Sequence, residues 1–213
     1  GSKKNPAILL NAGAGNQSIT WPVKFCVSLA NKGYFVVRYD YRDTGLSSGT
    51  DHEKNPYNVL DLAKDAVNVL KSYGLTKAHF VGFSMGGQLS QLAGAYLPNH
   101  VQSIILLGTS TDFRPGFSAF AGTYVGDELS PPNSDYVDYV NAYTQSLEHK
   151  SLTLQEKINA YVGIWKRLDG NGENFDEPFY REQGRVFHTR SNFPEPCLAH
   201  FKAMQTSYEL HEK

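Results

Sequence analysis

A serine between glycines, GFSMG at residues 82–86, directly follows the apolar run AHFVG at residues 78–82 and opens a stretch of helical periodicity at residues 85–97. This strand–turn–helix context is the one that a G-x-S-x-G motif requires. The turn has to be sharp, and glycines on either side of the serine leave room for it. The motif therefore predicts an α/β fold in which the Ser84 hydroxyl projects above a sheet. The alternative is a glycine-rich turn whose serine only caps the helix.

The first half of the chain repeats this alternation of short apolar runs and amphipathic helical patterns. Strands are predicted at residues 7–10, 34–39, 78–82 and 103–107, and helices at residues 20–31, 59–73 and 85–97. Strand and helix in regular alternation indicate a parallel sheet with right-handed crossovers. We therefore predict an α/β core over residues 1–108, with helices on both faces of the sheet.

After Leu107 the alternation stops. Residues 108–133 are loop-like, and helical patterns follow near residues 134–150, 153–168, 177–190 and 196–212. We predict a helical cap over residues 109–192, laid over the carboxyl ends of the strands, where open α/β sheets bind ligands. The many aromatic residues of this half suggest that the cap lines a roomy pocket. Residues 193–213 are expected to form a helix that returns toward the core.

Composition excludes several classes of partner. The chain of 213 residues has 20 Lys and Arg against 21 Asp and Glu, so no strong net field attracts nucleic acid or an anionic membrane. No apolar stretch approaches the ~20 residues that span a bilayer. Cys26 and Cys197 stand far apart, in no metal-binding spacing, and are predicted to be buried thiols rather than a disulfide. We expect a cytoplasmic protein that binds a small molecule; its oligomeric state is left open.

A serine nucleophile that attacks a carbonyl also needs donors for the oxyanion. The backbone N–H of Met85, the residue after the serine, is one predicted donor. The second should come from the loop NAGAGN at residues 11–16, whose small residues let the backbone approach a substrate. We place this donor at Ala14, with Gly15 as the alternative. A flexible glycine turn before a helix is the other reading of the loop.

The segment RYDYRDTGLSSG at residues 38–49 combines a strand end, alternating charges and a glycine turn. Asp40, Arg42 and Asp43 are expected to form a buried network of ion pairs and hydrogen bonds that braces the loop at residues 11–16. Such residues support the site, as the motif glycines Gly82 and Gly86 do, without taking part in the chemistry.

Four segments in this order and spacing, PAILLNAGAGN, WPVKF, VVRYDYRDTGLSSG and HFVGFSMGGQLSQLAG, resemble the α/β-hydrolase superfamily and, within it, the aclacinomycin methylesterase-like branch. The later KRLDGNGENFDEPFYREQG is similar to the cap of that branch. The resemblance implies hydrolysis of a carboxylic ester, with Ser84 as the nucleophile and Met85 with Ala14 or Gly15 as the oxyanion donors. It implies no metal and no organic cofactor.

The resemblance also raises the question of the acid and the base. The superfamily's fold opens with an antiparallel hairpin and closes with two strands whose loops carry the acid and the histidine, and we expect these parts to be missing here. His52 lies in a predicted loop, His79 in a strand and His100 at a helix end; the histidines assigned to cap helices are His149, His188, His200 and His211. None has a setting suited to a base.

Asp112, just past the fourth predicted strand, is a candidate for the acid. We therefore expect the 213-residue chain alone to be nearly inert toward esters. Two alternatives stay open: another reaction of the same serine turn (perhydrolysis, C–C hydrolysis or thioester hydrolysis), and a homologue that binds small molecules without catalysis.

Overall fold

The computed structural model describes residues 1–123, 132–149, 152–170, 173–193 and 197–207. The chain divides into two compact units. The first unit comprises Gly1–Asp112 and Ser191–Lys213, and the second comprises Phe113–Arg190. The last part of the chain thus belongs to the first unit.

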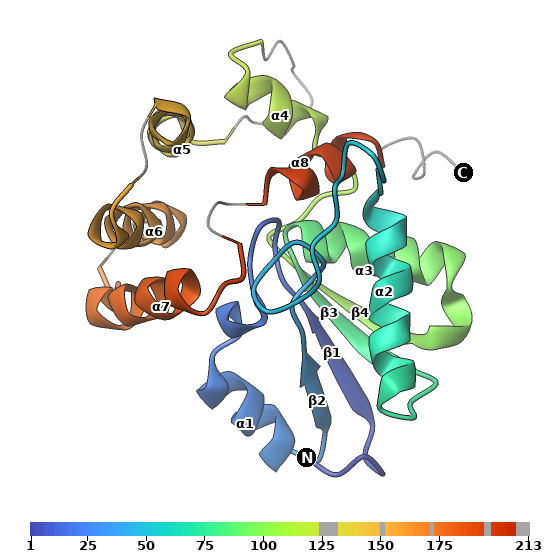
Figure 1. The fold of residues 1–213 in the computed structure, drawn as a ribbon. Coiled ribbons are helices and arrows are strands. Elements are labelled where there is room, and N and C mark those ends of the chain that lie inside the picture. The colour runs from blue at the N-terminus through green and yellow to red at the C-terminus, as the bar shows by residue number, and fades with distance from the viewer. Residues whose placement is uncertain (124–131, 150–151, 171–172, 194–196, 208–213) are drawn as a thin grey trace. The chain divides into compact units, whose positions relative to one another are not determined.

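The first unit is built on a parallel sheet of β1 (Ala7–Asn11), β2 (Phe35–Arg38), β3 (Ala78–Phe83) and β4 (Val101–Leu107). The strands lie in the order β2-β1-β3-β4, and each neighbouring pair is parallel. Figure 1 shows α1 (Val23–Asn31) on one side of this sheet and α2 (Val59–Ser72) and α3 (Met85–Tyr96) on the other. The predicted α/β class, a parallel sheet between helices, is confirmed.

Helix α2 shows why these residues form these elements. Its apolar residues recur at three- and four-residue spacing, and six of them are buried: Val59, Leu62, Ala63, Ala66, Val67 and Leu70. The side chain of Asn58 accepts the N–H of Asp61 while the side chain of Asp61 accepts the N–H of Asn58, so a capping box begins the helix. Just past its end Gly74 has a positive φ of 76°, which glycine adopts without strain.

Two short 3-10 helices, η1 (Ser18–Thr20) and η2 (Pro98–His100), and the helix α8 (Leu198–Gln205) complete the first unit. Helix α8 packs against α2. It occupies part of the range 196–212 in which a returning helix is expected; residues 194–196 and 208–213 lie outside the described residues.

The second unit consists of helices: α4 (Arg114–Phe120), α5 (Ser134–His149), α6 (Leu154–Leu168) and α7 (Glu177–Thr189). Helix α4 falls in the segment expected to be loop-like, and there the expectation is wrong. Its proline lies in the first turn, where the missing N–H costs nothing. Residues 124–131 of the same segment lie outside the described residues.

Many of the aromatic side chains of the second unit pack against one another. The rings of Trp165 and Tyr180 stack at 5.6 Å between centroids, and those of Tyr161 and Phe187 lie 5.3 Å apart. These ring pairs join α6 to α7. That this unit covers the strand ends as a cap stays a prediction.

Three observations concern the surface and the thiols. Among the described residues, no helix is long and apolar enough to cross a membrane.

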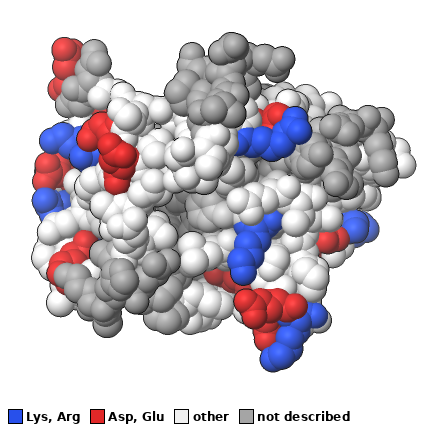
Figure 2. All heavy atoms as spheres, turned by 90° about the horizontal axis from the view of Figure 1, so that it is seen from above, with Lys and Arg blue, Asp and Glu red and all other residues white. Residues whose placement is uncertain are grey.

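Both cysteines are free; Cys197 is buried, but Cys26 is only half-buried, contrary to expectation. On the face shown in Figure 2, basic and acidic side chains are interspersed, and neither sign gathers into a wide field among the residues drawn in colour.

Candidate active site

Ser84 occupies the turn between β3 and α3, at the carboxyl edge of the sheet. Its backbone has φ 53° and ψ −123°, a positive φ that costs a non-glycine residue of order 1–3 kcal/mol. The N–H of Ser84 donates to the carbonyl of Leu107 at 3.1 Å, and its carbonyl accepts the N–H of Gly87 at 2.8 Å and the hydroxyl of Thr109 at 2.7 Å. Neighbouring backbone and a threonine side chain thus hold this strained turn.

The motif glycines are points of close backbone approach. A methyl group on Gly82 would collide with the carbonyl of Gly86, and one on Gly86 would collide with the carbonyls of Asn11 and Ala12. The first contact lets α3 fold back onto β3, and the second lets α3 approach the end of β1. Glycine at both positions therefore brings three segments together around Ser84.

The loop after β1 lies beside Ser84. A methyl group on Gly13 would lie 3.3 Å from the Cβ atom of Ser84. The N–H of Asn16 donates to the carbonyl of Gly13 at 3.1 Å, so residues 13–16 form a turn. Met85 directly follows Ser84 as the first residue of α3, so its N–H has no acceptor inside the helix. The structure thus brings together the serine and both segments expected to supply oxyanion donors.

The two candidates for the second donor differ in their hydrogen bonds. The N–H of Gly15 donates to Nδ1 of His200 at 3.0 Å, with His200 entering from α8. Gly15 itself has a positive φ of 68°. The Ala14 carbonyl accepts a hydrogen bond from Nδ2 of Asn16 at 3.3 Å. Gly15 is therefore already engaged, which favours Ala14.

A buried polar network lies beneath the turn. The side chain of Asn11, fully buried, donates from Nδ2 to Oγ of Ser90 at 3.1 Å, and Ser90 donates to the carbonyl of Gly86 at 2.7 Å. The hydroxyl of Tyr39 donates to Oδ1 of Asn11 at 3.0 Å, and burial raises the pKa of this phenol. The network links β1 to the first turn of α3. Nothing in the sequence patterns singles out Asn11 and Ser90.

Asp40 and Asp43 form separate contacts within the segment at residues 38–49. Asp40 accepts the N–H of Ser18, which follows the loop beside Ser84, at 2.7 Å and that of Leu46 at 3.0 Å. Asp43, buried and with a positive φ of 65°, accepts the hydroxyl of Tyr57 at 2.7 Å. Asp40 thus links Ser18, just after the loop at residues 11–16, to the segment at residues 38–49, which is the contact expected of a bracing residue.

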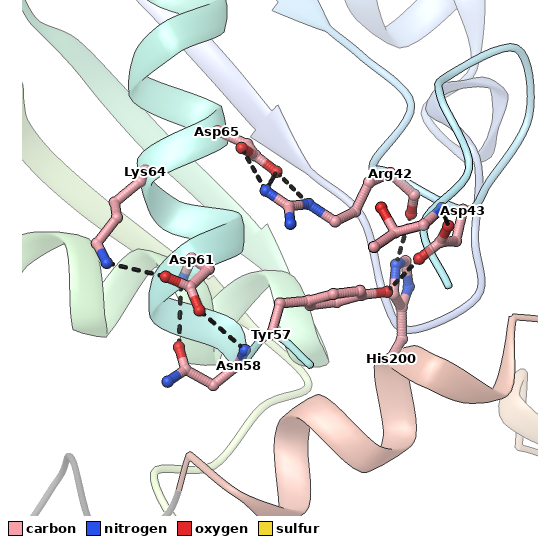
Figure 3. A network of polar contacts seen from close by, with 9 residues as sticks. Arg42, Asp43, Tyr57, Asn58, Asp61, Lys64, Asp65 and His200 are labelled. Atoms are coloured by element: carbon pink, nitrogen blue, oxygen red, sulfur yellow. Dashed lines mark hydrogen bonds and ion pairs between the residues drawn. The ribbon is translucent and has the colours of Figure 1, made fainter. Parts of the chain in front are cut away.

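Arg42 pairs outside the segment, contrary to the expectation of a buried network among the three charged residues. Its Nε and NH2 atoms each lie 2.7 Å from an oxygen of Asp65 on α2, a bidentate pair visible in Figure 3. The two side chains are 28% and 32% exposed, so the pair is not deeply buried. Asp65 lies 23 residues after Arg42, in α2, and no local sequence pattern identifies it as the partner.

The alpha/beta hydrolase fold family matches residues 6–211 of the chain. The chain belongs to this family. Two rhodomycin D methylesterases, from Streptomyces peucetius and Streptomyces sp. strain C5, are each 32% identical to it over 205 residues, covering 94% of this chain and 67% of their own length. The resemblance to the methylesterase-like branch of the α/β hydrolases is thereby confirmed.

Solved structures share the α/β hydrolase fold. A 2-hydroxy-6-oxo-6-phenylhexa-2,4-dienoate hydrolase from Rhodococcus sp. strain RHA1 aligns with a TM-score of 0.62 at 17% identity, over 98% of this chain and 64% of that one. A hydrolase from Pseudomonas aeruginosa PA01 aligns with a TM-score of 0.58 at 21% identity, over 95% and 63%. This chain spans about two thirds of the length of these relatives.

In this α/β hydrolase, three histidines of the first unit contact groups other than the Ser84 hydroxyl. His79 contacts Oγ of Ser103 at 2.7 Å, and His100 contacts the carbonyl of Thr76 at 2.8 Å. His52 contacts the carbonyl of Tyr57 at 3.2 Å.

The remaining acid and base candidates are placed as follows. His188 is in the second unit, while His211 and the side chain of His149 lie outside the described residues. Asp112 lies in the loop after β4, and its N–H donates to Oγ of Ser110 at 3.1 Å. His200 is expected in a cap helix, but it belongs to α8 in the first unit.

Proposed function

We propose that the protein is a serine hydrolase that cleaves a carboxylic ester of a small, hydrophobic molecule through an acyl-serine intermediate. The observation that carries the proposal is the backbone of Ser84, held at a positive φ between β3 and α3, with Gly13 so close that a methyl group on it would lie 3.3 Å from the Ser84 Cβ atom. A serine turn of this kind exposes its hydroxyl for attack. The similarity to the rhodomycin D methylesterases supports ester hydrolysis as the reaction.

In the proposed mechanism, Oγ of Ser84 attacks the ester carbonyl carbon and gives up its proton to a base. The N–H groups of Met85 and Ala14 hold the oxyanion of the tetrahedral intermediate. The intermediate collapses by releasing the alcohol, which takes the proton from the base, and water then cleaves the acyl-serine to the free acid. Ala14 is preferred to Gly15 because the N–H of Gly15 already donates to His200.

The identity of the base is a separate part of the proposal. The histidines of the first unit with described side chains all contact other partners: His52, His79, His100 and His200. A serine without a base is a weak nucleophile. We therefore expect the 213-residue chain alone to give only the ~10³–10⁴-fold rate enhancement over water that an oxyanion hole and binding supply. Asp112 remains the candidate acid within this chain.

A second candidate is a protein that binds a small molecule without catalysis. It is favoured by the histidines of the first unit with described side chains, which all contact groups other than the Ser84 hydroxyl. A fluorophosphonate distinguishes the two functions because it reacts covalently only with an activated serine. Perhydrolysis, C–C hydrolysis and thioester hydrolysis use the same turn and are distinguished by the substrate that is turned over.

The proposed partner is a small-molecule ester rather than nucleic acid or a membrane, with no metal or organic cofactor required by the mechanism. The interspersed surface charges support this choice of partner (Figure 2). The two free cysteines are consistent with a reducing compartment, and we propose a cytoplasmic location.

The proposal is tested with Ser84→Ala in the complete gene product. Hydrolysis of p-nitrophenyl esters should fall on the order of 10⁴-fold or more, because the substitution removes the nucleophile. Ser72→Ala, at an exposed serine of α2, is the matched control and should leave the rate unchanged. An unaltered rate in Ser84→Ala would end the claim that this serine is the nucleophile.

A further inference from the structure

His200 connects two loops of the first unit from inside the protein. Its side chain is fully buried. Nδ1 accepts the N–H of Gly15 at 3.0 Å, and Nε2 lies 3.0 Å from the carbonyl of Arg42. A carbonyl can only accept, so Nε2 carries the proton and Nδ1 is the acceptor. Both contacts thus require the same neutral tautomer, and neither nitrogen remains for proton transfer to a substrate.

The Gly15 contact fixes one particular peptide plane. In the turn at residues 13–16, the Gly13 carbonyl accepts the N–H of Asn16, and the third residue, Gly15, has a positive φ, as in a type II turn. The central peptide joins Ala14 to Gly15. Its oxygen is held by the side chain of Asn16, and its N–H is held by His200. With this plane fixed at both ends, the adjoining peptide, which carries the N–H of Ala14, has little freedom to rotate.

We propose that His200 is a positioning residue for ester hydrolysis: by holding Gly15 it aims the N–H of Ala14 at the oxyanion. This inference rests on the proposed function. His200 acts through Gly15 and touches neither the ester nor Ser84. Helix α8, which follows the second unit in the chain, thereby takes part in building the oxyanion hole of the first.

The surroundings of His200 hold the ring in place. Its ring meets those of Tyr41 and Tyr57 edge-on, at 5.6 and 6.3 Å between centroids. The carbonyl of Arg42 that it contacts belongs to the residue whose side chain is paired with Asp65 (Figure 3). A continuous series of contacts therefore leads from α2 to Gly15. Burial lowers the pKa of His200 to about 4, so Nδ1 remains an acceptor at neutral pH.

The test compares three substitutions at His200 in the complete gene product. His200→Asn places an amide oxygen near the position of Nδ1 and keeps an acceptor for Gly15. His200→Gln reaches the position of Nε2 and keeps a donor for Arg42 but leaves Gly15 without its acceptor. His200→Leu removes both contacts. His100→Gln, on η2 at the opposite end of the strands, is the control for loss of a histidine.

A displaced oxyanion donor costs on the order of 10²-fold in kcat. We expect His200→Leu and His200→Gln to lose about this much in kcat with KM changed less than ~3-fold, and His200→Asn to regain at least ~10-fold over His200→Leu. If His200 were only structural, kcat would fall in proportion to the stability of each variant, and His200→Asn and His200→Gln would have the same kcat. That result, or an unchanged kcat in His200→Leu, would overturn the inference.

A second measurement does not depend on activity. Hydrogen exchange of the Gly15 amide, followed by NMR in the complete gene product, should be slow in the wild type and His200→Asn and fast in His200→Gln and His200→Leu. Equal protection in all four would show that His200 does not hold the loop. If Ser84→Ala keeps full activity, the proposed function fails instead, and the exchange result still shows whether His200 anchors Gly15.

Discussion

At the scale of single residues, the backbone of Ser84 combines a functional position with a cost in stability. Its φ of 53° is unfavourable for any residue with a Cβ atom. We expect Ser84→Gly to be more stable than Ser84→Ala by roughly 1 kcal/mol. Glycine relieves the backbone strain, but its greater freedom in the unfolded chain offsets part of that gain. Urea unfolding of the two variants measures the difference. Equal midpoints would show that the turn is not strained.

His200 makes stability depend on pH. Burial lowers its pKa from 6.5 to about 4. Between these values the unfolded chain binds a proton that the folded protein excludes, so stability falls as the pH falls from about 6.5 to about 4 and is unaffected by this group below that. The full effect is about 3 kcal/mol, at ~1.4 kcal/mol per unit.

The groups that face this histidine or act on its charge are Arg42, Asp43, His52, Tyr41, Tyr57 and Cys197. Carboxylates also titrate in this window, so the quantity to measure is the difference between the wild type and His200→Asn in unfolding free energy at pH 7 and at pH 4.5. The wild type should lose more. Parallel losses would mean that His200 is not held neutral.

The sequence indicates some of these residues better than others. Ser84 and Met85 are found from the motif, because the chemistry of the turn depends on a local pattern. Arg42 can be recognised as a bracing residue, but its partner Asp65 cannot, because that pairing depends on the docking of α2. His200 is missed, although the buried residues His200, Ala203, Met204 and Ser207 lie at helical spacing and would mark an inward-facing stripe.

At the scale of elements, Ser207, two residues past the end of α8, completes the start of α2. The N–H of Val59, in the first turn of α2, has no acceptor within the helix and donates to Oγ of Ser207 at 2.8 Å. Ser207→Ala would leave this buried N–H unpaired and should lower the free energy of unfolding by about 1–3 kcal/mol.

Ser72→Ala is the control for this prediction, since Ser72 is exposed near the end of α2 and its hydroxyl donates to the carbonyl of Val69 in the same helix. It should change stability by less than ~0.5 kcal/mol. Both values come from chemical denaturation. A loss in Ser207→Ala no greater than that in Ser72→Ala would show that Ser207 does not cap α2.

The elements themselves follow from periodicity where the pattern is long. Helix α2 and strand β3 are predicted within about two residues at each end, because buried stripes and glycine boundaries define them. Helix α4 is not predicted, since its seven residues include Pro115 and Gly116 and are too few to show a helical period. Short elements with such residues depend on packing that sequence patterns do not display.

At the scale of the whole molecule, the proposed nucleophile and the proposed oxyanion donors all belong to the first unit. They come from the turn after β3 and the loop after β1, which approach each other because the carboxyl ends of parallel strands meet at one edge of the sheet. The second unit is predicted to select the substrate. The parallel topology could be predicted from the sequence because strand and helix alternate; the division near residues 112 and 191 follows from contacts distant in sequence.

The central claim is that Ser84 is an activated nucleophile, and the most direct test is to map the adduct that a fluorophosphonate forms with the complete gene product. We predict one covalent adduct on the peptide that contains Ser84, its absence in Ser84→Ala, and loss of ester hydrolysis in proportion to labelling. An adduct at another residue, or full hydrolysis by protein whose Ser84 is completely labelled, would contradict it.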